Sequence, residues 1–262
     1  MQITRRQFVS WLGASTVLGS AGWAYSAGSP AEALSTILRE SKPKSEQEKP
    51  AQGAAEAQPK HAATEHKQLT TPEEIWTDLM EGNRRFIAGK PKTRPLVAAR
   101  ERLASGQHPQ VIVLGCADSR VSPELVFDKN LGELFVVRTA GNIADPIALG
   151  SIEYAAEHLH SKVIVVLGHE KCGAVAAAAS GEKMPTPSLD AIVKRIFPAI
   201  EKYTICAQGD QLLGLAVEAN VQQSARDIVA ESTLLQKEVA ERKLTVIRAV
   251  YKLKTGEVQR LS

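Results

Sequence analysis

Aromatic residues are scarce in this chain of 262 residues, which contains three Trp, four Tyr and five Phe. A surface that binds nucleic acid by stacking needs exposed rings, so this scarcity argues against such a surface. The charge is nearly balanced, with 32 Lys and Arg against 29 Asp and Glu, and no block of five or more basic residues occurs. The composition therefore excludes nucleic acid as the expected partner and offers no polybasic patch for a membrane surface.

Cysteine is scarce as well. Three residues are too few for a disulfide-rich scaffold, and the odd number leaves one unpaired in any pairing. Hydrophobic residues nevertheless make up 44% of the chain and charged residues 23%. This balance is typical of a globular protein with a substantial core, and the length allows one or two domains.

The N-terminus carries the pattern of an export signal. Arg5 and Arg6 precede a weakly apolar stretch from Gln7 to Ala31 that has no charge and several Gly, Ser and Thr residues. Paired arginines before such a stretch are typical of a twin-arginine signal. We expect residues 1–33 to be this signal, handled by the twin-arginine export machinery, with a membrane anchor as the alternative. The protein would then lie in the periplasm or cell envelope, or in the thylakoid lumen of a source that has thylakoids.

A linker separates this signal from one compact domain. Residues 40–68 are rich in Lys, Glu, Gln, Ala and Pro, a composition that buries too little apolar surface to order itself. We therefore expect a disordered linker over 34–69 and a single domain over 70–262. The domain begins with a helix over 71–88, because a capping threonine, a proline and two acidic residues follow one another in Thr71-Pro72-Glu73-Glu74.

Short apolar runs alternate with helical patterns through the rest of the domain. This alternation predicts an α/β fold with a mainly parallel β-sheet flanked by helices. The expected strands are Val111–Leu114, Leu134–Val137, Val163–Leu167 and Leu244–Val250. The expected helices after the first are Pro123–Lys129, Pro146–His160, Gly173–Ser180, Leu189–Tyr203 and Leu212–Gln236.

Two of the expected strands end in residues that bind metal ions. Cys116 and Asp118 follow the first strand, and His169 and Cys172 follow the third. Ligands bind at the carboxyl ends of strands in open α/β sheets, so neighbouring strands would bring these side chains into one crevice. Zn²⁺ takes thiolate, imidazole and carboxylate ligands, and two sulfurs favour it over Mg²⁺ or Ca²⁺. The sequence therefore predicts a zinc site.

Arg120 indicates that the site is catalytic. A catalytic zinc site keeps one coordination position open, whereas a structural site is closed by four ligands. The guanidinium of Arg120 can hold the carboxylate of Asp118 in a bidentate pair and keep it off the metal. Water would take the vacated position, and zinc would convert it to a hydroxide that Asp118 orients. If Asp118 stays on the metal instead, the site is closed.

These motifs resemble those of the β-class carbonic anhydrases. Cys116-x-Asp118-x-Arg120 followed by His169-x-x-Cys172 is similar to the zinc signature of that family, and the resemblance extends over about residues 70–262. It implies one Zn²⁺ per chain, held by the two cysteines and the histidine. It also implies the β-carbonic anhydrase fold with a projecting N-terminal helix, and the reversible hydration of CO₂ to bicarbonate and a proton.

The resemblance adds further residues and an assembly. It implies that Gln107 lines the CO₂ pocket and that the N–H of Gly173 binds a substrate oxygen. Val113 stands where some members carry the Trp of an inhibitory bicarbonate site, which implies the plant-like, constitutively open subtype. The family's usual dimer exchanges N-terminal helices, so a homodimer or a higher even oligomer is expected. Trp76 and Phe86 would be the apolar anchors of that exchange, and packing of the helix on its own subunit is the alternative.

Two other functions stay open at this point. The same zinc chemistry could hydrolyse another small carbon compound, such as COS or CS₂, because access to the pocket decides the substrate. The chain could also be a non-enzymatic zinc protein that binds bicarbonate, which requires Asp118 to stay bound to the metal.

Overall fold

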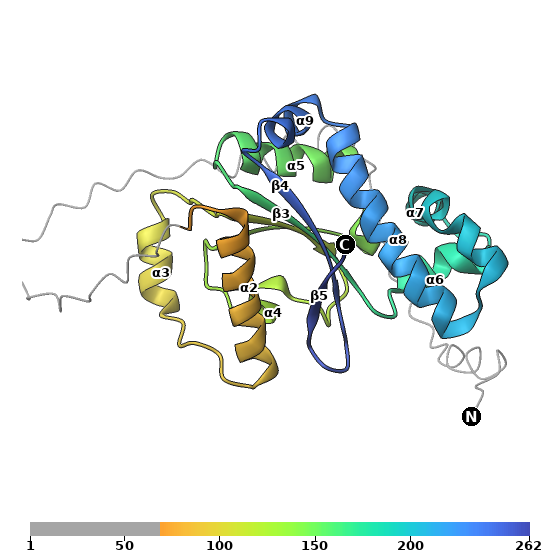
Figure 1. Ribbon diagram of the computed structural model, residues 1–262, viewed down its shortest axis with the longest axis horizontal. Coiled ribbons are helices and arrows are strands. Elements are labelled where there is room, and N and C mark those ends of the chain that lie inside the picture. The colour runs from red at the N-terminus through yellow and green to blue at the C-terminus, as the bar shows by residue number, and fades with distance from the viewer. Residues whose placement is uncertain (1–68) are drawn as a thin grey trace, which may run out of the picture. The chain divides into compact units, whose positions relative to one another are not determined.

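A computed structural model describes residues 69–262, so the expected signal and all of the expected linker except residue 69 lie outside the described part. The fold is built on a five-stranded sheet with the order β2-β1-β3-β4-β5 (Figure 1). The first four strands are parallel, and β5 is antiparallel to β4. Their bounds are β1 Val111–Cys116, β2 Leu134–Thr139, β3 Val163–His169, β4 Thr245–Tyr251 and β5 Val258–Arg260. The expected α/β fold with a mainly parallel sheet is confirmed.

The helices cover both faces of this sheet. Figure 1 shows α2 and α4 on one side and α5, α6 and α8 on the other. None of the helices within residues 69–262 is long and apolar enough to cross a membrane. The helix bounds are α2 Pro72–Ile87, α3 Leu96–Leu103, α4 Pro123–Val126, α5 Pro146–Glu157, α6 Gly173–Ser180, α7 Pro187–Cys206, α8 Gly209–Ala230 and α9 Thr233–Ala240, with a 3₁₀ turn η1 over Ala140–Asn142.

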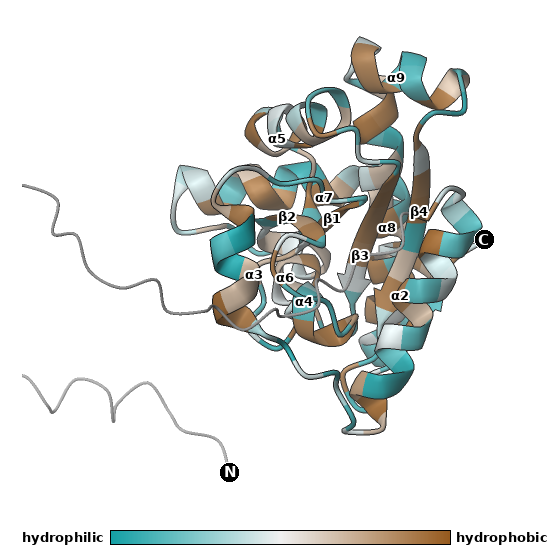
Figure 2. Cartoon of the chain, turned by 90° about the vertical axis from the view of Figure 1, so that its left-hand side faces the viewer, coloured by the Kyte–Doolittle hydropathy of each residue, from teal (hydrophilic) through white to brown (hydrophobic). Residues whose placement is uncertain are grey.

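The central strands are apolar on both faces, and Figure 2 shows β3 as a hydrophobic strand inside the domain. Successive side chains of a strand point to opposite faces, so β1 and β3 each contribute to two cores. Ile112, Leu114, Ile164 and Val166 pack with the helices from α5 to α9. Val113, Val163, Val165 and Leu167 pack with α2 and α4. Continuous burial explains why these strands read as apolar runs rather than as alternating patterns.

The first helix, α2, begins as the sequence predicts. The hydroxyl of Thr71 accepts a hydrogen bond from the N–H of Glu74, and the Glu74 carboxylate accepts one from the N–H of Thr71. This capping box satisfies two backbone donors of the first turn. Ile75 and Leu79 are fully buried in the core beneath the helix. In the described chain α2 therefore packs on its own subunit, the alternative to helix exchange, and Trp76 is only partly buried there.

Three features differ from the expectation. The single helix expected over Leu212–Gln236 is wrong, because the chain breaks between α8 and α9 and the hydroxyl of Ser232 caps the second helix by accepting from the N–H of Leu235. The short helix α3 was not expected; its start has no side-chain cap, so the local sequence marks it weakly. Strand β5 has only three residues and forms by pairing with β4, which no local pattern reveals.

Candidate metal centre

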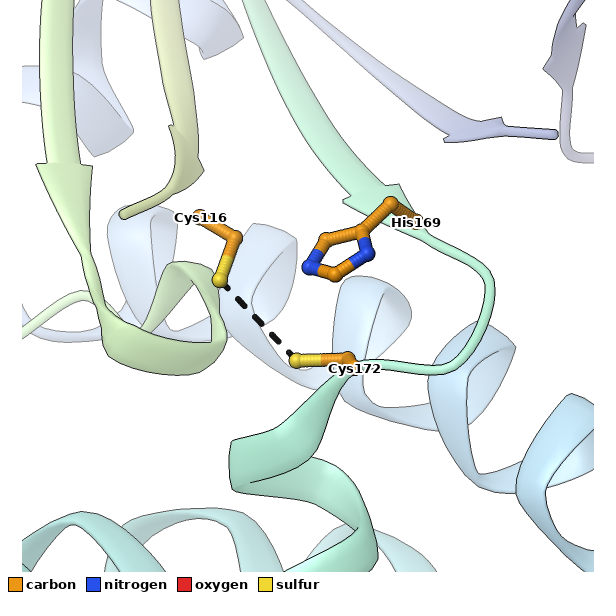
Figure 3. A group of neighbouring side chains, drawn as sticks. All are labelled: Cys116, His169 and Cys172. Carbon is orange, nitrogen blue, oxygen red and sulfur yellow. Dashed lines mark hydrogen bonds between the residues drawn. The ribbon is translucent and has the colours of Figure 1, made fainter. Parts of the chain in front are cut away.

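The strand order places the predicted ligands at one edge of the sheet. Cys116 is the last residue of β1 and His169 the last of β3, and these strands are parallel neighbours. Cys172 caps the N-terminus of α6, three residues after the end of β3. Figure 3 shows the three side chains pointing toward one another from these elements. The carboxyl ends of two strands and the start of one helix thus form a common site.

The three ligand atoms have the spacing that a tetrahedral metal needs. They lie within 4.8 Å of one another, and all three residues are buried. The sulfurs of Cys116 and Cys172 are 3.9 Å apart. A tetrahedral zinc ion with Zn–S bonds of about 2.3 Å separates two sulfurs by about 3.8 Å. The spacing of the two sulfurs therefore matches Zn²⁺, and the imidazole lies close enough to complete the ligand set.

His169 presents one ring nitrogen for a metal. Its Nδ1 lies 2.8 Å from the backbone oxygen of Glu170, so the N–H at Nδ1 donates to that carbonyl and Nε2 carries the lone pair. This Nε2 is buried and has no hydrogen-bond partner in the described chain. A buried polar atom without a partner is costly, and coordination of a cation would satisfy it. The orphaned nitrogen is independent support for a metal at this position.

The two thiols also favour a bound cation. Their mutual hydrogen bond lowers the pKa of Cys116 and raises the pKa of Cys172, because two adjacent thiolates repel each other. Backbone N–H groups of Ala174 and Val175 at the start of α6 lower the pKa of Cys172, but the contact with Cys116 outweighs them. The helix start alone thus does not make Cys172 a thiolate. A divalent cation between the sulfurs would replace the shared proton.

Asp118 and Arg120 form the expected bidentate pair. The Nε and Nη2 of Arg120 donate to the two carboxylate oxygens of Asp118 over 2.9 and 2.7 Å, and the N–H of Arg120 donates to the same carboxylate over 2.9 Å. These hydrogen bonds hold the pKa of Asp118 well below its usual range. The carboxylate stays near the ligands, with its Oδ2 3.9 Å from Nε2 of His169. It is therefore beside the metal position while engaged by Arg120.

Of the two remaining predicted residues, Gly173 lies at the site and Gln107 does not. Gly173 is the first residue of α6, is exposed, and has open space where a side chain would stand. Its place next to Cys172 brings it to the site. Gln107 is exposed and lines a different pocket with Leu103 and Gly132. No hydrogen bond in the described chain joins Gln107 to the ligands, so one chain alone does not bring it to the metal centre.

Arg138 was not predicted to take part in the site. Its Nε donates to the backbone oxygen of Cys116 over 3.0 Å, and its Nη2 donates to the backbone oxygen of Asp118 over 2.7 Å. The side chain therefore fixes the loop that carries the first ligand and the carboxylate. Its position at the end of β2, the strand beside β1, was the one available signal.

The parallel sheet and the Cys–His–Cys group at its carboxyl edge define a metal-binding α/β protein. The family model described as carbonic anhydrase matches residues 111–258. Carbonic anhydrase 2 of Mycobacterium tuberculosis is 38% identical over 193 residues, which cover 71% of this chain and 91% of that protein. The chain therefore belongs to the β-class carbonic anhydrases and is an enzyme of that family.

Solved structures agree with this assignment. The β-carbonic anhydrase of Coccomyxa, solved in complex with acetazolamide, matches with a TM-score of 0.58 and 30% identity over 70% of this chain and 84% of that one. A β-carbonic anhydrase of the fungus Aspergillus fumigatus matches with a TM-score of 0.59 and 25% identity over 72% of this chain and 91% of that one. The likeness extends over most of the described domain.

Proposed function

We propose that the chain binds one Zn²⁺ through Cys116, His169 and Cys172 and hydrates CO₂ reversibly to bicarbonate and a proton. The observation that carries this proposal is the engagement of Asp118 by Arg120 beside the three ligand atoms. A carboxylate held in this way leaves the fourth coordination position open, as a catalytic zinc site requires.

Zinc at this position would lower the pKa of a coordinated water below that of bulk water and so supply a hydroxide nucleophile. Asp118 would accept a hydrogen bond from the nucleophile and orient its lone pair toward the carbon of CO₂. Arg120 keeps Asp118 ionised and fixed for this task. The exposed N–H of Gly173, at the start of α6, would donate to the oxygen that gains negative charge.

The two alternative functions differ in what they require of the site. Hydrolysis of COS or CS₂ uses the same ligands, and a parallel assay of these compounds separates it from CO₂ hydration. A non-enzymatic, bicarbonate-binding zinc protein requires Asp118 to coordinate the metal. The three hydrogen bonds from Arg120 to this carboxylate weigh against that alternative.

The deciding experiment is stopped-flow CO₂ hydration by the full chain, with zinc content measured on the same sample. Activity with about one zinc per chain supports the proposal. Zinc without activity would contradict it and favour the closed site of a binding protein.

Activity is expected to rise between pH 6.5 and 9. Two thiolates offset the charge of Zn²⁺, so the ionisation that creates the nucleophile needs a higher pH than with three imidazoles. Asp118 does not contribute to this rise, because its lowered pKa keeps it ionised throughout the window. Hydration rates across this range check the prediction, and a flat profile would contradict it.

We propose that the chain assembles as a homodimer or a higher even oligomer through the β2 edge. This strand pairs only with β1 in the described domain, and all of its residues except the exposed Arg138 are half-buried. Beside it, residues of β2 and α5 line a groove of about 350 Å³, and one of them, Ile147, is 81% exposed. Apolar side chains next to an unpaired edge favour an interface, and a second copy would cover both. Gln107 would then line the CO₂ pocket only in the assembled enzyme.

Replacing Ile147 with glutamate is expected to weaken this assembly. A charge in the interface should cost about 2 kcal/mol, or about a 30-fold increase in the dissociation constant. The matched control is Ile205→Glu, because Ile205 is 86% exposed on α7 and does not line the groove. Light scattering across a dilution series measures both variants. Equal masses for the two variants would place the interface elsewhere.

We propose further that the chain is exported by the twin-arginine machinery to the periplasm or cell envelope. Support comes from Arg5 and Arg6 and from the uncharged stretch after them. The double variant Arg5→Lys, Arg6→Lys is expected to stay in the cytoplasm, because the export machinery reads the arginine pair rather than the charge. Cell fractionation with activity assays measures this, and an exported double variant would contradict the proposed route.

A further inference from the structure

The sulfur of Cys116 accepts a hydrogen bond from the main chain of another element. The backbone N–H of Gly141, in the turn η1, donates to the Sγ of Cys116 over 3.3 Å. Such a donor withdraws electron density from a thiolate and fixes the direction of its lone pairs toward a metal. Its effect matters most in a site with two thiolates, because their charges already offset that of Zn²⁺.

The turn that carries this donor has an unusual backbone. Gly141 has φ 73° and Asn142 has φ 47°, so two consecutive residues lie in the left-handed region. A Cβ at position 141 would lie 2.7 Å from Cδ1 of Ile196 and 3.2 Å from Cβ of Ala174. Glycine adopts this conformation without strain, and the close approach of Ile196 and Ala174 leaves no room for a side chain at position 141.

Asn220 of α8 holds this turn from inside the core. Its Nδ2 donates to the backbone oxygen of Gly141 over 2.7 Å, and the residue is 2% exposed. The helix that carries it is seated closely against β3, because a Cβ at Gly168 would lie 2.4 Å from Cγ2 of Val221. Gly168 precedes the ligand His169. The packing of α8 against Gly168 thus fixes Asn220 near His169. Its hydrogen bond to Gly141 holds the turn that contacts Cys116.

We propose that Asn220 is a positioning residue of the metal centre. Its amide holds Gly141 so that the N–H of that residue points at the sulfur of Cys116. The asparagine does not touch the metal and acts through one backbone residue. This inference rests on the proposed zinc function, because a hydrogen bond to the sulfur has this role only when Cys116 is a ligand.

The test compares Asn220→Leu with the wild-type full chain. Leucine has a similar volume and no donor, so Gly141 loses its anchor. The zinc dissociation constant, measured by competition with a chelator, is expected to rise about 10-fold, as for other outer partners of metal ligands. In the Co²⁺-substituted protein, the sulfur-to-cobalt charge-transfer band is expected to move to longer wavelength, because a thiolate with a weakened N–H contact gives up an electron more easily.

Two further variants keep the result interpretable. Asn220→Asp preserves the shape of the side chain and lacks the donor when ionised, so at alkaline pH it should act in the same direction. Ser224→Ala is the control, because Ser224 is buried one turn further along α8 and has no hydrogen bond to the turn η1 in the described structure. An unchanged band and zinc affinity in folded Asn220→Leu and Asn220→Asp would overturn the inference alone. A wild-type chain that takes up neither Zn²⁺ nor Co²⁺ would overturn the proposed function with it.

Discussion

Replacing Cys172 with serine is expected to abolish zinc binding and, with it, CO₂ hydration. A serine hydroxyl ionises far less readily than a thiol and is a poor ligand for Zn²⁺ near neutral pH. The remaining ligands, Cys116 and His169, cannot hold the metal with comparable affinity. Loss of an outer partner of a ligand costs about 10- to 100-fold in affinity, so loss of the ligand itself should cost more than about 100-fold. Zinc content after dialysis against a chelator, together with stopped-flow rates, measures the effect.

The chain provides its own control for this substitution. Cys206 is a free, exposed cysteine on α7 with no metal-binding neighbours in the described structure. Cys206→Ser should keep about one zinc per chain and wild-type rates. Chelator-treated wild type should regain activity when Zn²⁺ is added, whereas Cys172→Ser should not. Full zinc content in Cys172→Ser would show that the metal lies elsewhere.

Asp118→Asn is expected to reduce CO₂ hydration by about 10²- to 10³-fold while zinc content stays near wild type. The amide cannot accept the two parallel hydrogen bonds from Arg120 and cannot orient the nucleophile as a carboxylate does. The three ligands are untouched, so the metal should remain. Arg120→Ala should also reduce the rate, because it frees Asp118 to occupy the fourth coordination position.

The outcome of this substitution separates two roles of Asp118. Asp190→Asn is the matched control, since Asp190 forms an ion pair with Lys194 over 2.7 Å on the exposed side of α7. It should leave rate and zinc content unchanged. Loss of zinc together with activity in Asp118→Asn would identify the carboxylate as a fourth ligand. Retention of both would mean that the pair with Arg120 has no part in catalysis.

The proposed assembly bears on the role of Gln107. Gln107 lines a pocket with Leu103 and Gly132, away from the hydrogen-bond network of the metal ligands. Its implied place in the CO₂ pocket requires a second copy of the chain. A monomeric Ile147→Glu variant with full activity would therefore remove Gln107 from the site, whereas a monomer with reduced activity would support the interface as part of it.

The sequence by itself predicted the fold class and the residues of the candidate metal site. Apolar runs such as Val163–Leu167 predict strands buried on both faces, because a parallel sheet covered by helices leaves no polar side, and this run lies within the buried strand β3. Cysteine, aspartate and histidine at the ends of such strands predict a metal site, since few other structures need these residue types together. Local chemistry also set the start of α2, where Thr71 and Glu74 form the capping box within one turn.

Only the tertiary structure decided how these parts meet. The order β2-β1-β3-β4-β5 makes β1 and β3 neighbours, and without that order the ligands would not converge. The contacts of Arg138 and Asn220 depend on the tertiary structure, because each side chain donates to a backbone oxygen that is distant in sequence. Their hydrogen bonds exist only after the sheet and α8 have packed. Sequence patterns encode side-chain chemistry and local periodicity, whereas the direction of a backbone N–H toward a sulfur depends on packing across the whole domain.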